Sequence, residues 1–303
     1  MVATPRLREV EAGVLRVAFA EYGPPDGWPA VLLHGFPYDI HAYAEVAPRL
    51  AAAGARVVVP HLRGFGPTRF LSGMTPRSGQ QAVLAQDLLA LLDALGIAGA
   101  VLGGYDWGGR AACICAALWP GRVRGLVTVN GWNIQDIARS AEPQAPEREW
   151  RHWYQYYLHG ERGHAGLARN RREFCRLLWR LWSPTWAFDE ATFARSAAAF
   201  DNPDFVEVVV HSYRHRYALV AGDPAAEVVE RELARLPAIG VPTIHLDGAD
   251  DGVSPPAGAA DRGRFGGPYE YRLVPGAGHN LPQEAPESFA RAMLDVAGGQ
   301  ARR

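Results

Sequence analysis

Ten consecutive residues decide the fold: Ala100-Val101-Leu102-Gly103-Gly104-Tyr105-Asp106-Trp107-Gly108-Gly109. The run begins as a short apolar strand, and a long apolar helix is predicted directly after it. Small residues on both sides of Asp106 allow a strand to turn sharply into a helix and leave one side chain exposed at the turn. Serine is usual at this apex. A carboxylate there attacks a saturated carbon bearing a leaving group, which predicts an enzyme that opens carbon–oxygen or carbon–halogen bonds.

Segments of strand and helix character alternate along most of the chain. This alternation predicts an α/β fold with a mostly parallel sheet covered by helices on both faces. A helix is indicated at residues 80–95, because apolar residues recur at helical spacing and Gly96 supplies a stop. Besides the strand before Asp106, strands are expected at 14–20, 30–34, 56–60, 123–130, 242–247 and 269–274, and further helices at 42–53 and 286–296.

The segment 133–237 differs in composition from the rest. It is rich in arginine, tyrosine and tryptophan, and its pattern is helical throughout. A helical insertion between two strands of such a sheet is typical of a cap over an active site. We therefore expect an α/β core in two parts, residues 1–132 and 238–303, with a helical cap domain at 133–237.

Composition excludes several classes of partner. The 303 residues are 48% hydrophobic and carry a net charge of −1, which favours neither nucleic acid nor an anionic membrane. Residues 1–12 are interspersed with charge and lack an apolar signal segment, and no apolar run approaches the length of a membrane span. The three cysteines lack metal or disulfide spacing. We expect a cytoplasmic protein acting on a small molecule, with a homo-oligomer as an open alternative. All 31 basic residues are arginine, which indicates a GC-rich bacterial genome.

Three groups of polar residues follow strands of the expected sheet. The first is Asp106, the second is the pair Asp250 and Asp251, and the third is His279. The carboxyl ends of parallel strands meet at one edge of the sheet, where catalytic loops lie. The order nucleophile, acid, histidine is the order that α/β-hydrolases use.

From about Val14 to the C-terminal helix the chain resembles α/β-hydrolases of the epoxide hydrolase-like group. The motifs that carry the resemblance are His34-Gly35-Phe36-Pro37, Arg63-Gly64-Phe65-Gly66, Gly104-Tyr105-Asp106-Trp107-Gly108-Gly109, and Gly278-His279 with Glu284 and Pro286. The resemblance implies that Asp106 is the nucleophile and His279 the base that activates water against the Asp106 ester. It also implies that the backbone amides of Phe36 and Trp107 form the oxyanion hole.

The resemblance implies further roles at the acid position and in the cap. Asp251, three residues after Gly248, is expected to orient His279, with Asp250 as the alternative. The large, aromatic cap suits an apolar epoxide as the substrate. Two cap tyrosines, Tyr154 and Tyr213, are expected to protonate the departing epoxide oxygen, since a phenol stays protonated near neutral pH and donates a strong hydrogen bond.

Tyr156, Tyr157 and Tyr217 compete with these two assignments. His34 is expected to brace the oxyanion loop. The residues expected to contact substrate are His34, Pro37, Trp153 and Tyr217. Neither a metal nor an organic cofactor is required, and the pair His211 and His215 lacks a third ligand at sensible spacing.

Dehalogenation, of the haloalkane or the fluoroacetate type, and non-catalytic ligand binding compete with epoxide opening. Haloalkane dehalogenases resemble the chain at Asp106-Trp107, where an indole N–H can hold a halide, but usually have asparagine or glutamate where this chain has Phe36. Fluoroacetate dehalogenases share an arginine that matches Arg110 and resemble His152-Trp153, yet carry arginine in place of Trp107. A non-catalytic ligand-binding protein is the third reading, since a fold alone does not prove turnover.

Overall fold

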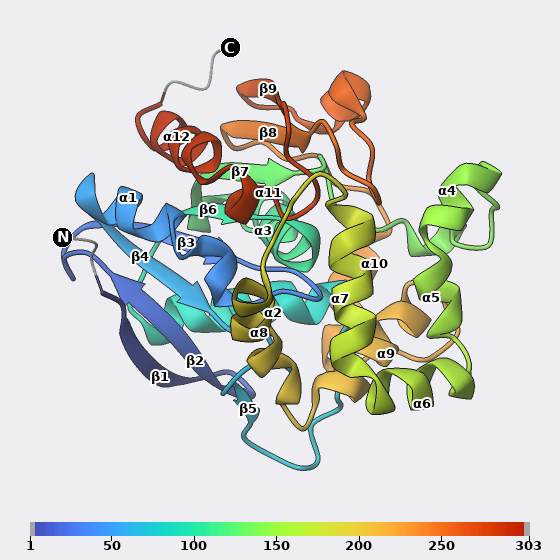
Figure 1. Cartoon of the computed structure of the whole chain (residues 1–303). Coiled ribbons are helices and arrows are strands. Elements are labelled where there is room, and N and C mark those ends of the chain that lie inside the picture. The colour runs from blue at the N-terminus through green and yellow to red at the C-terminus, as the bar shows by residue number, and fades with distance from the viewer. Residues whose placement is uncertain (1–3, 300–303) are drawn as a thin grey trace.

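One open sheet with helices on both faces forms the body of the protein in the computed structural model, which describes residues 4–299 (Figure 1). The strands in chain order are β1 (Arg6–Ala12), β2 (Leu15–Tyr22), β3 (Trp28–Leu33), β4 (Ala55–Pro60), β5 (Arg69–Phe70), β6 (Ala100–Gly104), β7 (Val123–Val129), β8 (Thr243–Gly248) and β9 (Tyr269–Val274). They lie in the order β1-β2-β4-β3-β6-β7-β8-β9, and β5 pairs with β2. Neighbouring strands are parallel along the stretch β4-β3-β6-β7-β8-β9 of this order. Strand β2 pairs antiparallel with β1, β4 and β5.

Helices cover both faces of this sheet. Those of the body are α1 (Val46–Ala52), α2 (Gln81–Ala94), α3 (Asp106–Leu118), α11 (Leu281–Glu284) and α12 (Pro286–Ala297). Neighbouring residues of β6 show the two layers, because a Cβ on Gly103 would meet Met293 of α12 and one on Gly104 would meet the backbone of α3. Since alternate residues of a strand face opposite sides, α12 and α3 lie on opposite faces. This burial on both sides explains why β3 and β6 are continuous apolar runs, and β8 is buried along its whole length as well.

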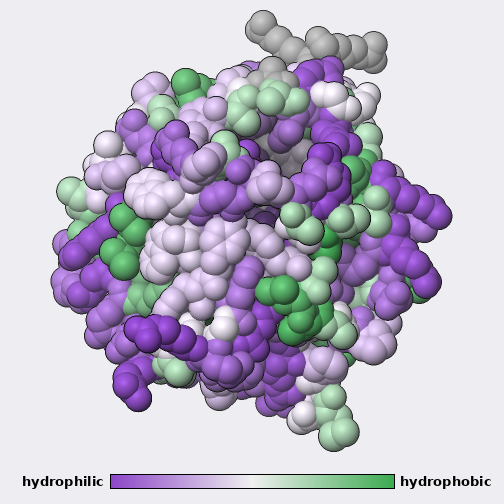
Figure 2. Space-filling view, turned by 90° about the vertical axis from the view of Figure 1, so that its right-hand side faces the viewer, coloured by the Kyte–Doolittle hydropathy of each residue, from purple (hydrophilic) through white to green (hydrophobic). Residues whose placement is uncertain are grey.

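The segment between β7 and β8 is helical. It contains α4 (Pro146–Arg151), α5 (Trp153–Tyr157), α6 (Glu161–Arg169), α7 (Arg171–Trp182), α8 (Glu190–Ala197), α9 (Phe205–His215) and α10 (Glu227–Leu233). In Figure 1 these helices, coloured green to gold, gather to one side of the sheet. Figure 2 views the molecule from that side and shows hydrophobic residues in small separate groups among hydrophilic ones.

The expected α/β fold with a mostly parallel sheet is confirmed, but three details differ. The sequence pattern missed β1, which is an exposed edge strand with polar residues and therefore lacks the apolar alternation of a half-buried strand. It also missed the two-residue strand β5. The helix expected at 42–53 is in fact a 3-10 turn at Ile40–Tyr43 followed by α1, because the Asp39 side chain caps the turn through the amide of His41.

Two remaining expectations concern the chain ends and the membrane. Residues 1–3 and 300–303, the outer ends of the two expected core segments and the start of the stretch searched for a signal, lie outside the described residues. Within residues 4–299, no helix combines the length and the apolar character needed to cross a bilayer.

Candidate active site

Asp106 stands at the junction of β6 and α3 with a left-handed backbone, at φ 49°. This conformation is strained for any residue with a side chain, and such strain often marks a functional position. Close approach of the flanking backbone enforces the turn, since a Cβ on Gly108 would lie 2.1 Å from the carbonyl oxygen of Leu33. Alanine at that position would therefore collide with β3. The local sequence thus holds the Asp106 carboxylate at the edge of the sheet.

The loop after β3 supplies a hydrogen bond to this carboxylate. The backbone N–H of Phe36 donates to Asp106 Oδ1 at 2.7 Å. A Cβ on Gly35 would lie 2.4 Å from the Asp106 Cβ, so only glycine permits this approach. The amide of Trp107 lies in the first turn of α3, where helix N–H groups have no acceptor within the helix. Both expected oxyanion-hole amides therefore lie next to Asp106.

His279 links the nucleophile position to an acid. Its Nδ1 lies 2.8 Å from Asp251 Oδ2, and its Nε2 lies 3.9 Å from Asp106 Oδ2. Asp251 is buried and also accepts hydrogen bonds from the amides of Val253 and Ser254 and from the side chain of Asn130. These bonds fix the carboxylate toward His279.

The alternative acid, Asp250, points elsewhere. Its carboxylate accepts a hydrogen bond from Thr185 at 3.2 Å on the exposed side of the loop. The structure therefore brings Asp106, His279 and Asp251 together and leaves Asp250 outside the group.

The electrostatics of the pair formed by Asp106 and His279 favour the charged forms. Burial alone would lower the pKa of His279, but the carboxylates of Asp251 and Asp106 raise it to about 10. Burial opposes ionisation of Asp106, yet His279, the charge of Arg110 and the Phe36 amide hold its pKa below the usual value. In the resting protein a carboxylate therefore faces an imidazolium.

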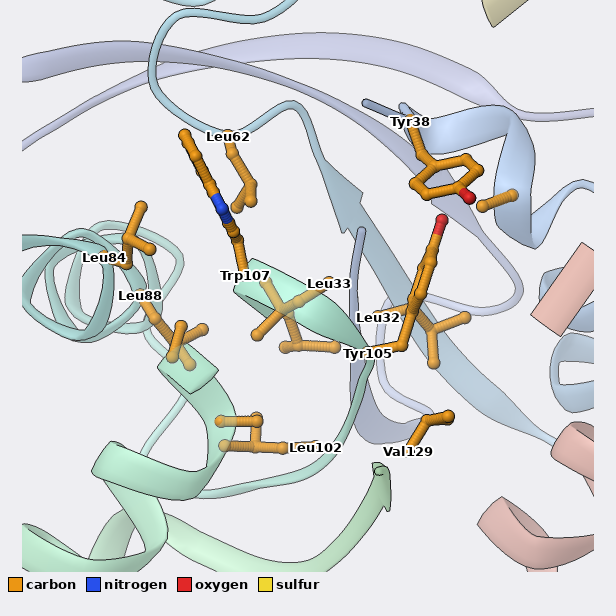
Figure 3. Close-up of a cluster of buried hydrophobic side chains, with 14 of the residues drawn as sticks. Leu32, Leu33, Tyr38, Leu62, Leu84, Leu88, Leu102, Tyr105, Trp107 and Val129 are labelled. Atoms are coloured by element: carbon orange, nitrogen blue, oxygen red, sulfur yellow. The ribbon is translucent and has the colours of Figure 1, made fainter. Parts of the chain in front are cut away.

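Aromatic rings surround His279. The Trp182 ring lies 5.1 Å from the imidazole, and the rings of Tyr38 and Tyr105 lie 6.3 and 6.2 Å away. Figure 3 shows Tyr38 and Tyr105 approaching from opposite directions with their hydroxyl groups pointing toward each other, and Trp107 on the far side of Leu33. These buried rings exclude bulk water from the group and strengthen its electrostatic interactions.

Two of the expected cap tyrosines reach the site. The rings of Tyr154 and Tyr213 are both buried and lie 5.3 Å apart. Tyr213 packs against Phe36 and Trp107, at 5.5 and 6.1 Å between ring centres. Burial raises the pKa of Tyr154 to about 12 and that of Tyr213 well above its ordinary value, so both phenols stay protonated at neutral pH.

The competing tyrosines lie farther out. Tyr156 is exposed and donates to Glu149, and Tyr157 stacks on Phe174 at 5.9 Å. Tyr217 donates to Gln155 Oε1 at 3.1 Å, and the Gln155 amide in turn donates to Tyr154 Oη at 2.9 Å. Tyr217 is therefore connected to Tyr154 through one side chain.

The remaining expected residues have mainly structural contacts. His34 uses both ring nitrogens, since Nε2 accepts from the Leu62 amide at 3.1 Å and Nδ1 donates to the carbonyl of Gly35 at 2.9 Å. The Pro37 carbonyl accepts from the Trp179 indole at 2.7 Å. Trp153 packs against the rings of Tyr154 and Tyr157 on its own helix, α5, and against Phe174 on α7.

His211 and His215 stack on each other, and His211 bonds to the amide of Gly79 and the carbonyl of Ala221, as in a packed pair. Within residues 4–299 no group of three or more metal-ligating side chains comes together.

Sequence reasoning did not predict the contacts that hold the loops carrying Asp251 and His279. The backbone carbonyl of Trp182 accepts from the amides of both Gly252 and His279, which ties the end of α7 to the acid and histidine loops. Glu284 accepts from Ser183 and from the amides of Gly278 and Asn280. Glu284 was visible in the motif around His279, whereas nothing in the local sequence marks Trp182.

Comparison with known proteins identifies the family. A family model described as the alpha/beta hydrolase fold matches residues 29–286. The chain belongs to the α/β hydrolase fold family. A solved structure of a candidate epoxide hydrolase from Klebsiella pneumoniae is 47% identical, covers 96% of this chain and 97% of that chain, and superimposes with a TM-score of 0.95.

Two curated relatives match over shorter segments. Bifunctional epoxide hydrolase 2 of Sus scrofa is 36% identical over 124 residues, which are 40% of this chain and 21% of that protein. A haloalkane dehalogenase of Psychrobacter cryohalolentis is 37% identical over 120 residues, which are 40% of this chain and 39% of that protein. The matches thus span about a fifth and two fifths of these relatives.

Proposed function

We propose that this α/β-hydrolase opens an epoxide to a vicinal diol through an ester on Asp106. One observation carries the proposal: several buried polar atoms near Asp106 and His279 have no hydrogen-bond partner among the described residues, and His279 Nε2, Tyr213 Oη and Trp107 Nε1 are among them. Buried polar groups are normally satisfied, so donors left open beside a carboxylate are suited to a substrate. The name of the Klebsiella pneumoniae relative supports the same activity.

The first step forms the ester. Oδ1 of Asp106 already accepts from the Phe36 amide, so Oδ2 is the oxygen that attacks an epoxide carbon. The carbon–oxygen bond of the ring breaks, and the ring oxygen takes a proton from Tyr213 or Tyr154. Because Gln155 donates to the Tyr154 oxygen, the Tyr154 O–H is left to point at the substrate.

The second step hydrolyses the ester. Esterification removes the negative charge of Asp106, which is one of the two charges that raise the pKa of His279. His279 can then give its proton back to the tyrosinate and act as a base toward water. The attacking water places its oxygen on the Asp106 carboxyl carbon, and the amides of Phe36 and Trp107 stabilise the resulting oxyanion. Collapse releases the diol and restores the carboxylate.

We also assign the cap, the compartment and the absence of a cofactor. Helices α5, α7 and α9 serve as a cap that supplies the two tyrosines and Trp182. We place its action in the cytoplasm, a reducing compartment, because all three cysteines are free and buried. The mechanism itself uses no cofactor.

A dehalogenase is the second candidate, and the open indole N–H of Trp107 favours it. The same nucleophile would displace a halide, with Trp107 holding the departing ion. Against this, the Phe36 side chain supplies no second halide donor. The match to the Psychrobacter cryohalolentis haloalkane dehalogenase supports this alternative.

Intact-protein mass spectrometry on His279→Gln separates these functions. Without the base the ester should persist, so an epoxide should add its whole mass to the protein. A haloalkane adduct that lacks hydrogen halide would instead identify a dehalogenase. Adding Asp106→Ala must abolish either adduct. If Asp106→Ala alone binds substrate as the wild type does and the wild type converts none, the protein is a binding protein.

A further inference from the structure

An arginine without an acidic partner covers one of the two cap tyrosines. Arg216 directly follows α9, and its guanidinium carbon lies 4.3 Å from the centre of the Tyr213 ring. Its Nε is buried without a hydrogen-bond partner, and its Nη2 makes a long contact of 3.5 Å to the Ser212 hydroxyl. Among the described residues no carboxylate forms an ion pair with Arg216, whereas Arg214 pairs with Glu161 at 3.0 Å. The main contact of the Arg216 charge is therefore the face of the Tyr213 ring.

The Tyr213 ring lies in surroundings that stabilise a negative charge poorly. It is fully buried, and it packs on Phe36 and Trp107 of the body and against Tyr154 of α5. Its Oη has no hydrogen-bond partner among the described residues. A phenolate formed there would have neither bulk water nor a donor from these rings, and an unsolvated charge is costly. Arg216 places a positive charge against this ring.

The proposed first step moves a negative charge from the body into the cap. When Asp106 attacks an epoxide carbon, its carboxylate becomes a neutral ester. The carbon–oxygen bond of the ring breaks, its electron pair stays on the oxygen, and that oxygen takes the proton of Tyr213. The charge that Asp106 loses therefore appears on Tyr213 as a phenolate. An interaction that is stronger with this phenolate than with the neutral phenol accelerates the step.

Arg216 provides such an interaction. A phenolate spreads its negative charge into the ring, so a cation over the ring face attracts it more strongly than it attracts the neutral phenol. The other cap phenol has a different support, since Gln155 donates to the Tyr154 oxygen at 2.9 Å. Each of the two phenols thus has one neighbour that favours its ionised form.

The charged groups that face Tyr213 shift its pKa in opposite directions. Burial raises the pKa of Tyr213 well above its ordinary value, and Tyr154 and Asp106 raise it further. Arg216 and Arg110 oppose this rise. A phenol with a lower pKa gives up its proton more readily, so the cation over the ring makes Tyr213 a stronger acid.

We propose that Arg216 stabilises the phenolate that Tyr213 forms when it protonates the epoxide oxygen. This inference rests on the proposed epoxide opening and extends it to a residue outside the group around Asp106. Arg216 acts through Tyr213 and not on the substrate. Its positive charge, rather than its shape, should therefore set the rate of ester formation.

Single-turnover formation of the Asp106 ester, followed by intact-protein mass spectrometry, is the first test. Arg216→Gln and Arg216→Met both remove the charge, and methionine keeps an unbranched apolar side chain against the ring. Each should slow ester formation by about tenfold, the equivalent of about one pKa unit in the acid. Arg216→Lys keeps the charge and should recover most of this loss. The matched control is Arg214→Gln, whose charge pairs with Glu161, and it should change the rate by less than about twofold.

Ionisation of the phenol at position 213 is the second test and needs no substrate. Difluorotyrosine is inserted in place of Tyr213, because the fluorine atoms lower the phenol pKa and fluorine NMR follows its ionisation in the folded protein. The pKa of this phenol should be about one unit higher in Arg216→Gln and Arg216→Met than with Arg216 present. Arg216→Lys should restore the lower value. Thermal melting checks that each variant is folded, and Arg216→Met carries the comparison if Arg216→Gln is not.

The outcomes separate this inference from the proposed function. If Arg216→Met forms the ester as fast as the wild type, or if Arg216→Lys is as slow as Arg216→Met, the positive charge is not what Arg216 supplies and the inference is wrong. An unchanged phenol pKa in the neutral variants would also overturn it. If no epoxide forms an ester, the proposed epoxide opening fails. A raised phenol pKa in the neutral variants would then still show that Arg216 stabilises the Tyr213 phenolate.

Discussion

Replacing Asp251 by asparagine should stop the second step and spare the first. The Asp251 carboxylate accepts from the amides of Val253 and Ser254 at 2.8 and 2.7 Å on one oxygen, and from His279 and Asn130 at 2.8 and 3.1 Å on the other. In Asp251→Asn the remaining oxygen keeps the two amides. The new side-chain NH₂ group then faces two hydrogen-bond donors, the Nδ1–H of His279 and the side-chain amide of Asn130.

The imidazole must respond by changing its tautomer. Nδ1 of His279 becomes the acceptor and Nε2 carries the proton, so Nε2 cannot take a proton from water. General-base catalysis is worth about 10²- to 10⁴-fold, and ester hydrolysis should slow by that factor. Formation of the Asp106 ester should continue, because it needs no base. The ester should therefore accumulate during turnover.

The assay is quenched-flow mixing with an epoxide followed by intact-protein mass spectrometry. Asp250→Asn is the matched control, since Asp250 contacts only Thr185 on the exposed side of the loop. It should clear the ester at close to the wild-type rate. Thermal melting of both variants checks that they are folded. Rapid clearance in Asp251→Asn together with slow clearance in Asp250→Asn would refute the assignment of the acid.

Three further predictions follow from the same contacts. Tyr213→Phe should slow ester formation by about 10²-fold or more, because it removes a proton donor. Tyr156→Phe changes an exposed ring and should leave the rate of ester formation unchanged. Stopped-flow single turnovers measure both rates. Gly108→Ala should lower the melting temperature markedly, because the new Cβ would lie 2.1 Å from a backbone oxygen of β3. Gly121→Ala is the control and should leave the melting temperature unchanged, because the space around Gly121 is open. The pKa of His279 is raised from 6.5 to about 10, so its stabilising effect is complete below about pH 6.5 and is lost as the pH rises through about 10. Melting temperatures should therefore fall over this range more steeply for the wild type than for His279→Gln; parallel curves would contradict the raised pKa.

The sequence predicted best those features that are local or that follow from sheet topology. Asp106 is held by its immediate neighbours, so ten residues suffice to recognise the turn. His279 and Asp251 follow β9 and β8, and parallel strands bring their carboxyl ends to one edge. The α/β fold follows from the alternation of strands and helices in the same way.

What depends on the docking of the helical insertion could not be predicted from the residue pattern, and only the family resemblance favoured Tyr154 and Tyr213 over the competing tyrosines. Tyr154, Tyr156 and Tyr157 share one short helix, and only its orientation against the body decides that Tyr154 faces inward. The contact of Trp182 with the catalytic loops and the position of Arg216 over Tyr213 depend on the same packing. These are contacts between segments far apart in the sequence, which residue patterns do not encode.

In the proposed ester mechanism the oxygen added to the substrate comes from Asp106 and not directly from water. A single turnover in H₂¹⁸O with enzyme in excess over epoxide tests it. We expect an unlabelled diol and one ¹⁸O atom in the peptide that contains Asp106, read by mass spectrometry after digestion. A labelled diol with an unlabelled peptide would show that water attacks the epoxide directly and would contradict the ester mechanism.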